Sequence, residues 1–372
     1  MAGQVLLKDQ LFNVQTVQRL AQEYAQAVSQ FNAARFEKEA LSGFAERELL
    51  ARLEWLADCA AVQLPADFPA MADALEAAMP HPLDPTRTDD DFGHFIHAVP
   101  GILAVRHGLE AHRSRAMDLV YAATQRFSME FYIRPFLNRW PDETLAALRI
   151  WAGDDNYHVR RLVSEGTRPK LPWAKSITTT PDQTLPLLDM LHADPTRYVT
   201  RSVANHLNDL SKSVPDLVLQ RLSNWRKAGL QSSKELDWMT RHALRTMIKS
   251  GHPGAMDALG FYAGAQVDVA VTLVETTVQI GHALEFECIV SAPEDTLVLV
   301  DYRLSFARPA GKTGQKVFKL KQGKVSKNTP LKLHKRHKLK ADATTFTWHP
   351  GPHSVTIQVN GVDRAHHAFD VI

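Results

Sequence analysis

The stretch His158-Val-Arg-Arg161 recurs twice further along the chain, as Tyr198-Val-Thr-Arg201 and as Trp238-Met-Thr-Arg241. A spacing of 40 residues between the arginines is typical of stacked helix pairs of the HEAT or armadillo kind. One helical turn after each arginine, on the same face of the predicted helix, lie Glu165, Asn205 and Arg245. Stacked units of this kind would align a row of polar side chains along one wall, and we expect the function to lie there.

The size and composition of the chain set the broad class. With 372 residues, 45% of them hydrophobic, the chain is long enough for two or three domains, or for one solenoid with an added module. Cys59 and Cys288 form neither a disulfide framework nor a metal-binding pair. No apolar run has the length of a membrane span, and the N-terminus lacks a signal-peptide core. We therefore expect a protein of the reducing cytoplasm with no membrane partner.

Charge is spread unevenly along the chain, although the net charge is only +2. Residues up to about 90 include more acidic than basic side chains, whereas residues 312–340 contain no acidic residue at all. This asymmetry favours a polyanionic partner at one end of the molecule, although a merely solvated face remains the alternative. The basic residues of the segment are Lys312, Lys316, Lys319, Lys321, Lys324, Lys327, Lys332, Lys335, Arg336, Lys338 and Lys340.

The spacing of apolar residues predicts helices over the first two thirds of the chain. Residues 6–78 have apolar side chains at intervals of three and four, and residues 80–86 form a proline-rich loop. Helical patterning resumes at Asp90 and continues to about residue 261. Within it, Val99-Pro100-Gly101 predicts a turn.

After Gly264 the pattern changes to alternation, as in residues 267–273, 284–288 and 355–359. This predicts a β-sandwich of immunoglobulin-like size, without the paired cysteines and buried tryptophan of antibody domains. The predicted fold is an α-helical HEAT-like solenoid, residues 1–264, followed by an immunoglobulin-like domain, residues 265–372. Lys319 and Lys321 alternate with apolar residues, so we expect them on the outer face of a strand.

Residues 160–173 read Arg-Arg-Leu-Val-Ser-Glu-Gly-Thr-Arg-Pro-Lys-Leu-Pro-Trp. Together with residues 127–136, 92–102 and 203–209, this string resembles the AlkC branch of the HEAT-like DNA glycosylases. The resemblance covers roughly residues 85 to 260. It implies removal of cationic N-alkylated bases, chiefly 3-methyladenine and 3-methylcytosine, from double-stranded DNA in base excision repair. It also implies a reaction without base flipping and without a cofactor, in a protein that we expect to be monomeric and associated with the nucleoid.

The chemistry of such a reaction indicates which side chains matter. An alkylated base is already cationic and leaves without protonation, so the enzyme must stabilise positive charge on the sugar and guide a water molecule. Carboxylates can do both, and an aromatic face can add cation–π attraction. The candidate catalytic residues are Glu130, Glu165, Asp209 and Trp173. The candidate DNA contacts are Arg134, Arg160, Arg161, Arg168, Arg201, Asn205, His206, Arg241, Arg245, Lys319 and Lys321.

Each of these candidates has a structural alternative. Aspartate–arginine pairs between neighbouring repeats commonly hold helical solenoids together, so the arginines need not bind phosphate. Glu130 has Arg134 four residues later and Glu165 has Arg161 four residues earlier, which permits ion pairs within a helix. The tryptophan at residue 173 is placed to act as a hydrophobic staple at a helix start.

Two other functions fit parts of the same pattern. A non-catalytic scaffold would bind nucleic acid with the same basic wall, using the carboxylates only to orient arginines. A protein-interaction module would show little salt-sensitive DNA binding, and the lysine-rich segment speaks against it. The pairs His94/His97 and His334/His337 have metal-like spacing, but no third ligand completes either set, so we expect no metal site.

Overall fold

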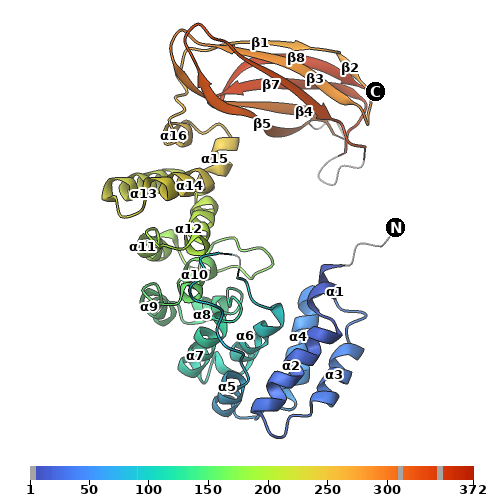
Figure 1. The fold of residues 1–372 in the computed structure, drawn as a ribbon, viewed down its shortest axis with the longest axis vertical. Helices are drawn as coiled ribbons and strands as arrows, with labels where there is room; N and C mark the ends of the chain where they lie inside the picture. Colours follow the sequence, from blue (N-terminus) through green and yellow to red (C-terminus); the bar gives the residue numbers. More distant parts are fainter. Residues whose placement is uncertain (1–5, 90, 309–312, 342–346) are drawn as a thin grey trace. The chain divides into compact units, whose positions relative to one another are not determined.

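The computed structural model describes residues 6–89, 91–308, 313–341 and 347–372 (Figure 1). A helical region precedes a β domain, which confirms the predicted fold class. The chain divides into two compact units. The first unit extends to Leu210 and includes Trp225–Met239, and the second comprises Ser211–Asn224 and Thr240–Ile372. The predicted domain boundary after residue 264 stays a prediction.

The N-terminal helices follow the predicted pattern. Their apolar faces meet in a core that includes Leu20, Tyr24, Phe36 and Leu56. Residues 80–86 form no helix or strand, as expected for a segment with three prolines. The helices are α1 (Leu7–Leu11), α2 (Val14–Ala27), α3 (Ala33–Ser42), α4 (Leu49–Ala61) and α5 (Phe68–Ala77).

The next helical segment begins later than predicted. Asp90 lies outside the described residues, and helix first appears at the 3-10 turn η1 (Phe95–Ala98). The turn predicted at residues 99–101 is wrong, because these residues begin helix α6 (Val99–Leu103). Proline is tolerated in a first helical turn, where its missing N–H needs no partner. A Cβ on Gly101 would lie 2.4 Å from the Tyr132 ring, so the glycine allows close contact. The π-type turn η2 (Ala104–Gly108) follows.

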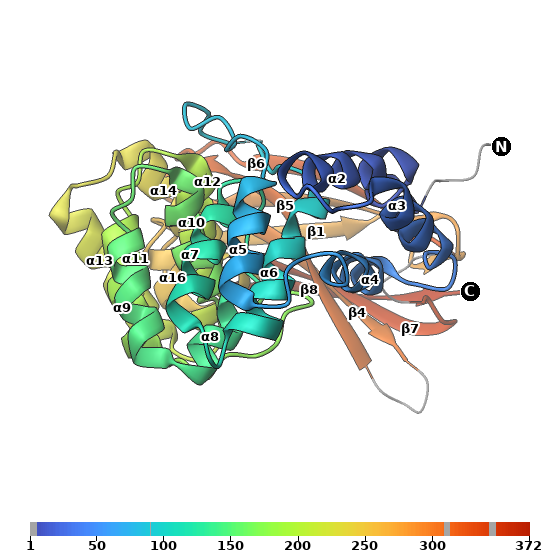
Figure 2. The same ribbon diagram turned by 90° about the horizontal axis from the view of Figure 1, so that it is seen from below.

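The repeats around the arginine motifs form two layers within the first unit. Helix α10 packs against α12, and α9 packs against α11 (Figure 2). Buried Val159 and Leu162 on α10 face the interior, as do Val199 and Val203 on α12. Arg161 and Arg201 therefore hold equivalent positions on neighbouring helices. The elements are α7 (Arg113–Thr124), α8 (Ile133–Arg139), α9 (Pro141–Trp151), α10 (Tyr157–Gly166), α11 (Pro181–Leu191) and α12 (Arg197–Leu210).

Four more helices, two of them with five residues each, complete the helical region. They are α13 (Pro215–Ala228), α14 (Ser233–Ala243), α15 (Arg245–Lys249) and α16 (Pro253–Asp257). No helix in the described part of the chain is long and apolar enough to cross a bilayer.

The β domain is a sandwich of two sheets. One sheet has the strand order β1-β3-β6 and the other the order β2-β8-β7-β4-β5. Alternate residues such as Phe286, Tyr302 and Ile357 fill the space between the sheets. The strands are β1 (Asp268–Leu273), β2 (Thr277–Val278), β3 (Ala283–Ser291), β4 (Thr296–Ala307), β5 (Thr313–Val325), β6 (Leu331–Lys338), β7 (Gly351–Val359) and β8 (Val362–Val371).

Two details of the β domain were not foreseen. Trp348, in the loop before β7, is buried in the core, so the domain does contain a buried tryptophan. On the outer face of β4, Leu299 packs with Met256 and Phe261 from the segment around α16. The amide of Asn360 fastens this contact by donating to the carbonyl of Tyr262 at 3.0 Å. The outer face of β4 is therefore covered within the second unit.

Candidate active site

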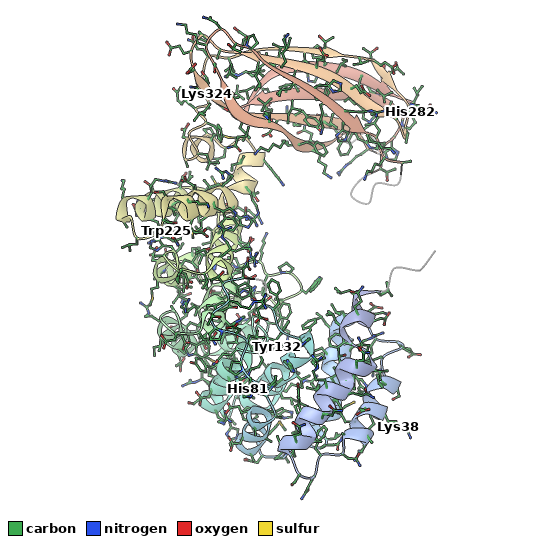
Figure 3. The ribbon with its side chains drawn as sticks, viewed as in Figure 1. Lys38, His81, Tyr132, Trp225, His282 and Lys324 are labelled. Carbon is green, nitrogen blue, oxygen red and sulfur yellow. The ribbon has the colours of Figure 1, made fainter. Side chains whose placement is uncertain are left out.

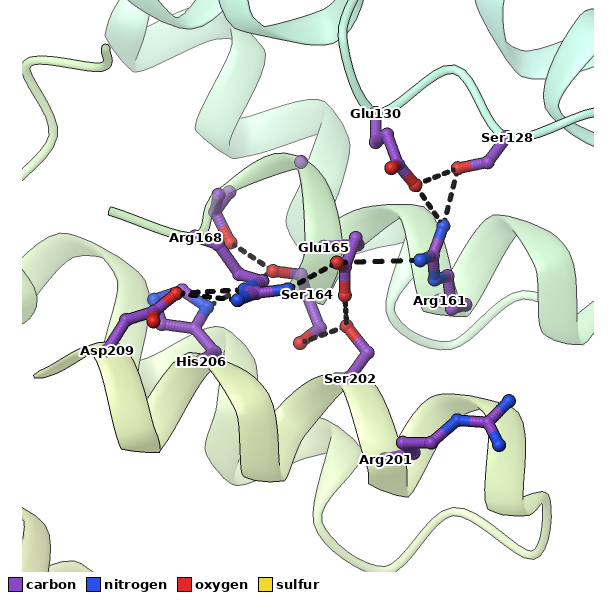
Figure 4. A network of polar contacts seen from close by, with 12 residues as sticks. Ser128, Glu130, Arg161, Ser164, Glu165, Arg168, Arg201, Ser202, His206 and Asp209 are labelled. Atoms are coloured by element: carbon purple, nitrogen blue, oxygen red, sulfur yellow. Dashed lines mark hydrogen bonds and ion pairs between the residues drawn. The ribbon is translucent and has the colours of Figure 1, made fainter. Parts of the chain in front are cut away.

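The predicted catalytic carboxylates lie in one polar network of the first unit (Figure 4). The loop between α7 and α8 supplies Glu130, helix α10 supplies Glu165, and helix α12 supplies Asp209. Arginines lie between the carboxylates, so that acids and arginines alternate along a chain of ion pairs. The order is Glu130, Arg161, Glu165, Arg168 and Asp209.

Arg161 stands between two carboxylates. Its guanidinium donates to Glu130 Oε2 and, at 2.6 Å, to Ser128 Oγ, and it lies 3.5 Å from Glu165 Oε1. It also lies 4.8 Å from the centre of the Tyr198 ring, a cation–π contact. Burial lowers the pKa of Arg161, but the charges of Glu130 and Glu165 outweigh burial and raise the pKa overall. The guanidinium therefore stays charged.

Glu165 is buried and fully engaged. Its Oε1 accepts from Arg168 Nη1 at 2.6 Å, and its Oε2 accepts from Ser202 Oγ at 2.6 Å. Burial raises the pKa of the carboxyl, but Arg161 and Arg168 outweigh it and hold the pKa below the usual value. Glu165 therefore remains ionised at neutral pH, although it is almost out of contact with solvent.

The third carboxylate is tied to the same chain of charges. Arg168 donates through Nε to Asp209 Oδ2 at 2.9 Å. The ion pair of Glu165 with Arg161 that the structural alternative allowed is present, whereas Glu130 pairs with Arg161 and not with Arg134. Sequence reasoning missed the hydroxyls of Ser128 and Ser202, because nothing in their spacing distinguishes them from other serines.

Glu130 and Glu165, the two leading candidates for catalysis, differ in access to water. The side chain of Glu130 is 18% exposed, whereas that of Glu165 is 6% exposed. One oxygen of Glu130 accepts from Arg161 and from Ser128 Oγ at 2.7 Å. Glu130 is thus the carboxylate that a water molecule reaches most readily.

Trp173 does not act as a hydrophobic staple. Its side chain is 71% exposed, and the next helix begins only at Pro181. Its φ of 64° lies in the left-handed region, which costs a non-glycine residue about 1–3 kcal/mol. With Phe131 and Tyr132, it lines a cavity of about 290 Å³ (Tyr132 is labelled in Figure 3). The structure thus presents an exposed aromatic face beside the residues that follow Glu130.

Arg134 and His206 were predicted to contact DNA phosphates, and the structure buries both side chains. Arg134 is 1% exposed and donates to the carbonyls of Gly166, Arg168 and Lys175 at 2.6–3.0 Å. His206 is completely buried, and burial lowers its pKa to about 4. A side chain enclosed in this way cannot reach a phosphate. Arg134 instead fastens the loop that carries Trp173.

The other predicted arginines of the first unit have mixed roles. Arg160 donates to Asp194 at 2.5 Å and to the carbonyl of Asp154 at 2.8 Å, which links neighbouring repeats as in the structural alternative. Arg201 pairs with Asp89, and its side chain is 33% exposed. Asn205 is partly buried and also has a partner. Arg201 is therefore the most accessible cation of this face.

The predicted contacts of the second unit lie at the surface or near it. Arg241, Lys319 and Lys321 are exposed, and Arg245 donates to the carbonyl of His242. Lys312 lies outside the described residues. Lys324, labelled in Figure 3, pairs with Asp295 at 2.5 Å, so part of the basic charge has an acidic partner from outside the segment.

The histidine pairs do not form metal sites in the described part of the chain. His97 pairs with Glu23, and His337 bonds to the Tyr302 hydroxyl at 2.8 Å. Among the described residues, no three groups of the metal-binding types gather in one place.

Comparisons with known proteins agree with this architecture. Residues 268–372 match a family model described as the C-terminal Ig-like domain of the uncharacterised protein YhaZ. The uncharacterized protein YhaZ of Bacillus subtilis (strain 168) is 34% identical over 260 residues, which span 69% of this chain and 71% of YhaZ. A solved structure of Pseudomonas fluorescens alkylpurine DNA glycosylase AlkC, bound to DNA containing an abasic site analog, is 30% identical with a TM-score of 0.86. The match covers 99% of this chain and 100% of AlkC.

The helical repeats, the chain of paired acids and arginines, and the added sandwich together define a class of helical-repeat proteins with an Ig-like domain. Within that class, the extent of the similarity decides the family. The chain belongs to the AlkC-type family of DNA glycosylases, in the branch that carries a C-terminal Ig-like domain.

Proposed function

We propose that this protein is a DNA glycosylase that removes cationic N-alkylated bases from double-stranded DNA by hydrolysis of the N-glycosidic bond. Its substrates are 3-methyladenine and 3-methylcytosine. The observation that carries the proposal is the pair of carboxylates, Glu130 and Glu165, held on two sides of Arg161. The similarity over the whole chain to AlkC, solved with an abasic site analog, supports it.

The two carboxylates have different roles in this proposal. The cationic base leaves without protonation, so the reaction needs negative charge near the sugar and an oriented water molecule. Glu130 is the more accessible group and holds the water. Glu165 is enclosed and ionised, so it acts through its fixed negative charge rather than as a base for the water. Arg161 orients both groups and keeps them apart.

The lesion remains close to the duplex in the proposed reaction. The exposed Trp173 ring offers an aromatic face to a cationic base, an attraction of about 0.5–2 kcal/mol. Its position beside Phe131 and Tyr132 provides a surface on which the base can rest without entering a deep pocket. The reaction then requires no base flipping.

DNA is held through its phosphates, which carry no sequence information. Arg201 in the first unit and Arg241, Lys319 and Lys321 in the second are the proposed contacts, since all four reach solvent. Arg201 would exchange its partly exposed bond to Asp89 for a phosphate. The protein acts as a monomer in this proposal.

The test is release of free base from defined duplexes that contain one 3-methyladenine or one 3-methylcytosine. We expect Glu130→Gln and Glu165→Gln to lose excision by about 100-fold or more, because the charge that stabilises the sugar is halved. Affinity for a duplex with an abasic site analog should persist in both variants. The matched control is Glu143→Gln, which removes a carboxylate of an exposed ion pair with Arg113 and should leave excision unchanged.

The alternatives predict different results in the same assay. A non-catalytic scaffold would bind duplex DNA tightly and release no base. A protein-interaction module would show little DNA binding that depends on salt. Wild-type rates in both glutamate variants would overturn the carboxylate assignment.

A further inference from the structure

Ser128 lies two residues before Glu130, in the loop between α7 and α8, and bonds to its carboxylate (Figure 4). The serine hydroxyl donates to Glu130 Oε2 at 2.7 Å and accepts from Arg161 Nη1 at 2.6 Å. The same nitrogen of Arg161 also donates to Glu130 Oε2. The three side chains therefore form a closed triangle, in which each one bonds to the other two.

The residue between Ser128 and Glu130 anchors this part of the loop. Met129 is completely buried, and its carbonyl accepts from the amide of Ile133 at 3.1 Å. A Cβ on Gly101 would lie 2.6 Å from Met129 Sδ, so the thioether packs closely against the backbone of α6. With the middle residue fixed in the core, the residues on either side of it are held at a constant separation beside the guanidinium.

The available donors fix the hydrogen positions in the triangle. A guanidinium has only donors and an ionised carboxylate only acceptors, whereas a hydroxyl has one proton and two lone pairs. The proton of Ser128 therefore points to Glu130, and a lone pair of its oxygen faces Arg161. Both bonding functions of the hydroxyl are engaged within the protein, so Ser128 orients the carboxylate and does not react.

Both bonds of the triangle end on the same oxygen of Glu130. Oε2 accepts from Ser128 and from Arg161, and Oε1 takes part in neither bond. The last torsion of a glutamate side chain has broad minima, so a carboxylate held by one bond can turn about it. Two bonds from different directions fix its plane. They leave Oε1 for a water molecule, on a side chain that is 18% exposed.

The serine beside Glu165 acts differently. Glu165 Oε1 accepts from Arg168 and Oε2 accepts from Ser202, so each oxygen has its own partner. The hydroxyl of Ser202 thus occupies the second oxygen of its carboxylate, whereas the hydroxyl of Ser128 binds the oxygen that already has a partner. This difference leaves one oxygen of Glu130 available and none of Glu165.

We propose that Ser128 is a positioning residue of the hydrolytic step, which fixes the plane of the Glu130 carboxylate so that Oε1 holds the attacking water. This inference rests on the proposed function, in which Glu130 holds that water. The water oxygen forms a bond to C1′ of the sugar as the glycosidic bond breaks. The electron pair of the broken bond neutralises the cationic base, and a proton of the water passes to Glu130 Oε1. Ser128 keeps its own proton throughout.

The first test is single-turnover excision by the full chain from a duplex with one 3-methyladenine. Ser128→Ala should lower the rate constant by roughly 10-fold to 100-fold, the usual effect of one hydrogen bond to a charged group, and leave affinity for a duplex with an abasic site analog unchanged. Ser128→Thr keeps the hydroxyl and should restore most of the rate. The control is Ser42→Ala, which removes an exposed hydroxyl bonded to the Glu39 carbonyl. Wild-type rates in Ser128→Ala, or a threonine variant as slow as the alanine variant, would overturn the proposal.

A double-mutant cycle separates positioning from a merely structural role. Ser128 acts through Glu130, so Ser128→Ala should slow the Glu130→Gln protein by less than about twofold further. A serine that only supports the loop would slow both backgrounds by the same factor. A further loss of about tenfold in the double variant would therefore refute the positioning role.

Crystal structures of the wild type and of Ser128→Ala test the inference without any base release. In the wild type we expect an ordered water at about 2.6–3.2 Å from Glu130 Oε1. In Ser128→Ala the carboxylate plane should turn about its remaining bond to Arg161, and the water should be lost. The same plane and the same water in both structures would refute the role of Ser128, even if Glu130→Gln abolishes excision and so supports the proposed function. A turned carboxylate in a protein that releases no base would support the role of Ser128 while the proposed function fails.

Discussion

Two buried carboxylates, one in each unit, show how partners rather than burial decide the state of an acid. Glu165 is 5% exposed and Asp301 is 8% exposed, so burial opposes ionisation in both. Glu165 has two arginines and a serine around it, and its pKa is lowered. At Asp301 burial outweighs the opposing charge of Lys319, and the pKa is raised to about 6. Two arginines outweigh the cost of burial at Glu165, whereas the charge of Lys319 does not outweigh it at Asp301.

The largest expected effect on stability comes from removing Arg161, the cation that lies between Glu130 and Glu165. Arg161→Met leaves Glu130 and Glu165 without their shared cation and should lower the free energy of unfolding by about 3–5 kcal/mol. Urea unfolding followed by far-ultraviolet circular dichroism measures the change. The matched control is Arg226→Met, whose pair with Asp237 is exposed on both sides and should contribute no more than about 1 kcal/mol.

The pH dependence of the same variant sharpens the result. In the wild type the folded pKa of Glu165 is depressed, so its stabilisation is present above the unfolded pKa and is lost as the pH falls through the lower folded pKa. Without Arg161 the folded pKa should rise toward the unfolded value, so the acid-dependent loss should be smaller and should end at a higher pH. Equal losses of stability in Arg161→Met and Arg226→Met would mean that burial adds nothing to the Arg161 pairs.

Removal of the Asp301 carboxylate should change stability in the opposite direction. Asp301→Asn removes a buried charge whose pKa is raised by burial, and it should stabilise the second unit at pH 7.5 by up to about 2–3 kcal/mol. The folded pKa lies above the unfolded value, so the wild type loses stability as the pH rises from about 4 to 6. Hydrogen exchange of the β4 amides at pH 4 and 7.5 measures the effect. The gain should vanish at pH 4, and a destabilised variant at pH 7.5 would reveal a partner within the protein.

The smallest expected effect on stability comes from replacing Arg201, the accessible cation on α12. Arg201→Gln breaks a partly exposed pair with Asp89 and should change stability by less than about 1 kcal/mol. If Arg201 contacts a phosphate, the slope of log affinity for DNA against log salt should fall by about one. The control is Arg35→Gln, which breaks an exposed pair with Glu39 and should leave the slope unchanged. An unchanged slope for Arg201→Gln would remove this residue from the proposed DNA contacts.

Much of the site was visible in the sequence because its residues follow the repeat. The spacing of 40 residues predicted equivalent positions for Arg161 and Arg201, and these do lie on neighbouring helices. The Arg-Arg-Leu-x-x-Glu string at residues 160–165 indicated the paired charges of α10. Alternation after residue 264 likewise predicted the sandwich. Such patterns depend on helix and strand geometry, which each segment shows in its own sequence.

Contacts between distant segments could not be predicted in this way. The sequence permitted an ion pair of Glu130 with Arg134 one turn later, but Arg134 donates to three carbonyls and Arg161 pairs with Glu130 instead. The burial of His206 and of Asp301 likewise depends on which elements cover them.

The sequence by itself determined the period of the helices, the alternation of the strands and the acids and arginines that carry charge. Only the tertiary structure decided which charges meet and which are enclosed. The physical reason is range: periodicity follows from backbone geometry within one turn or strand, whereas burial and pairing depend on side chains that the fold brings together from distant parts of the chain.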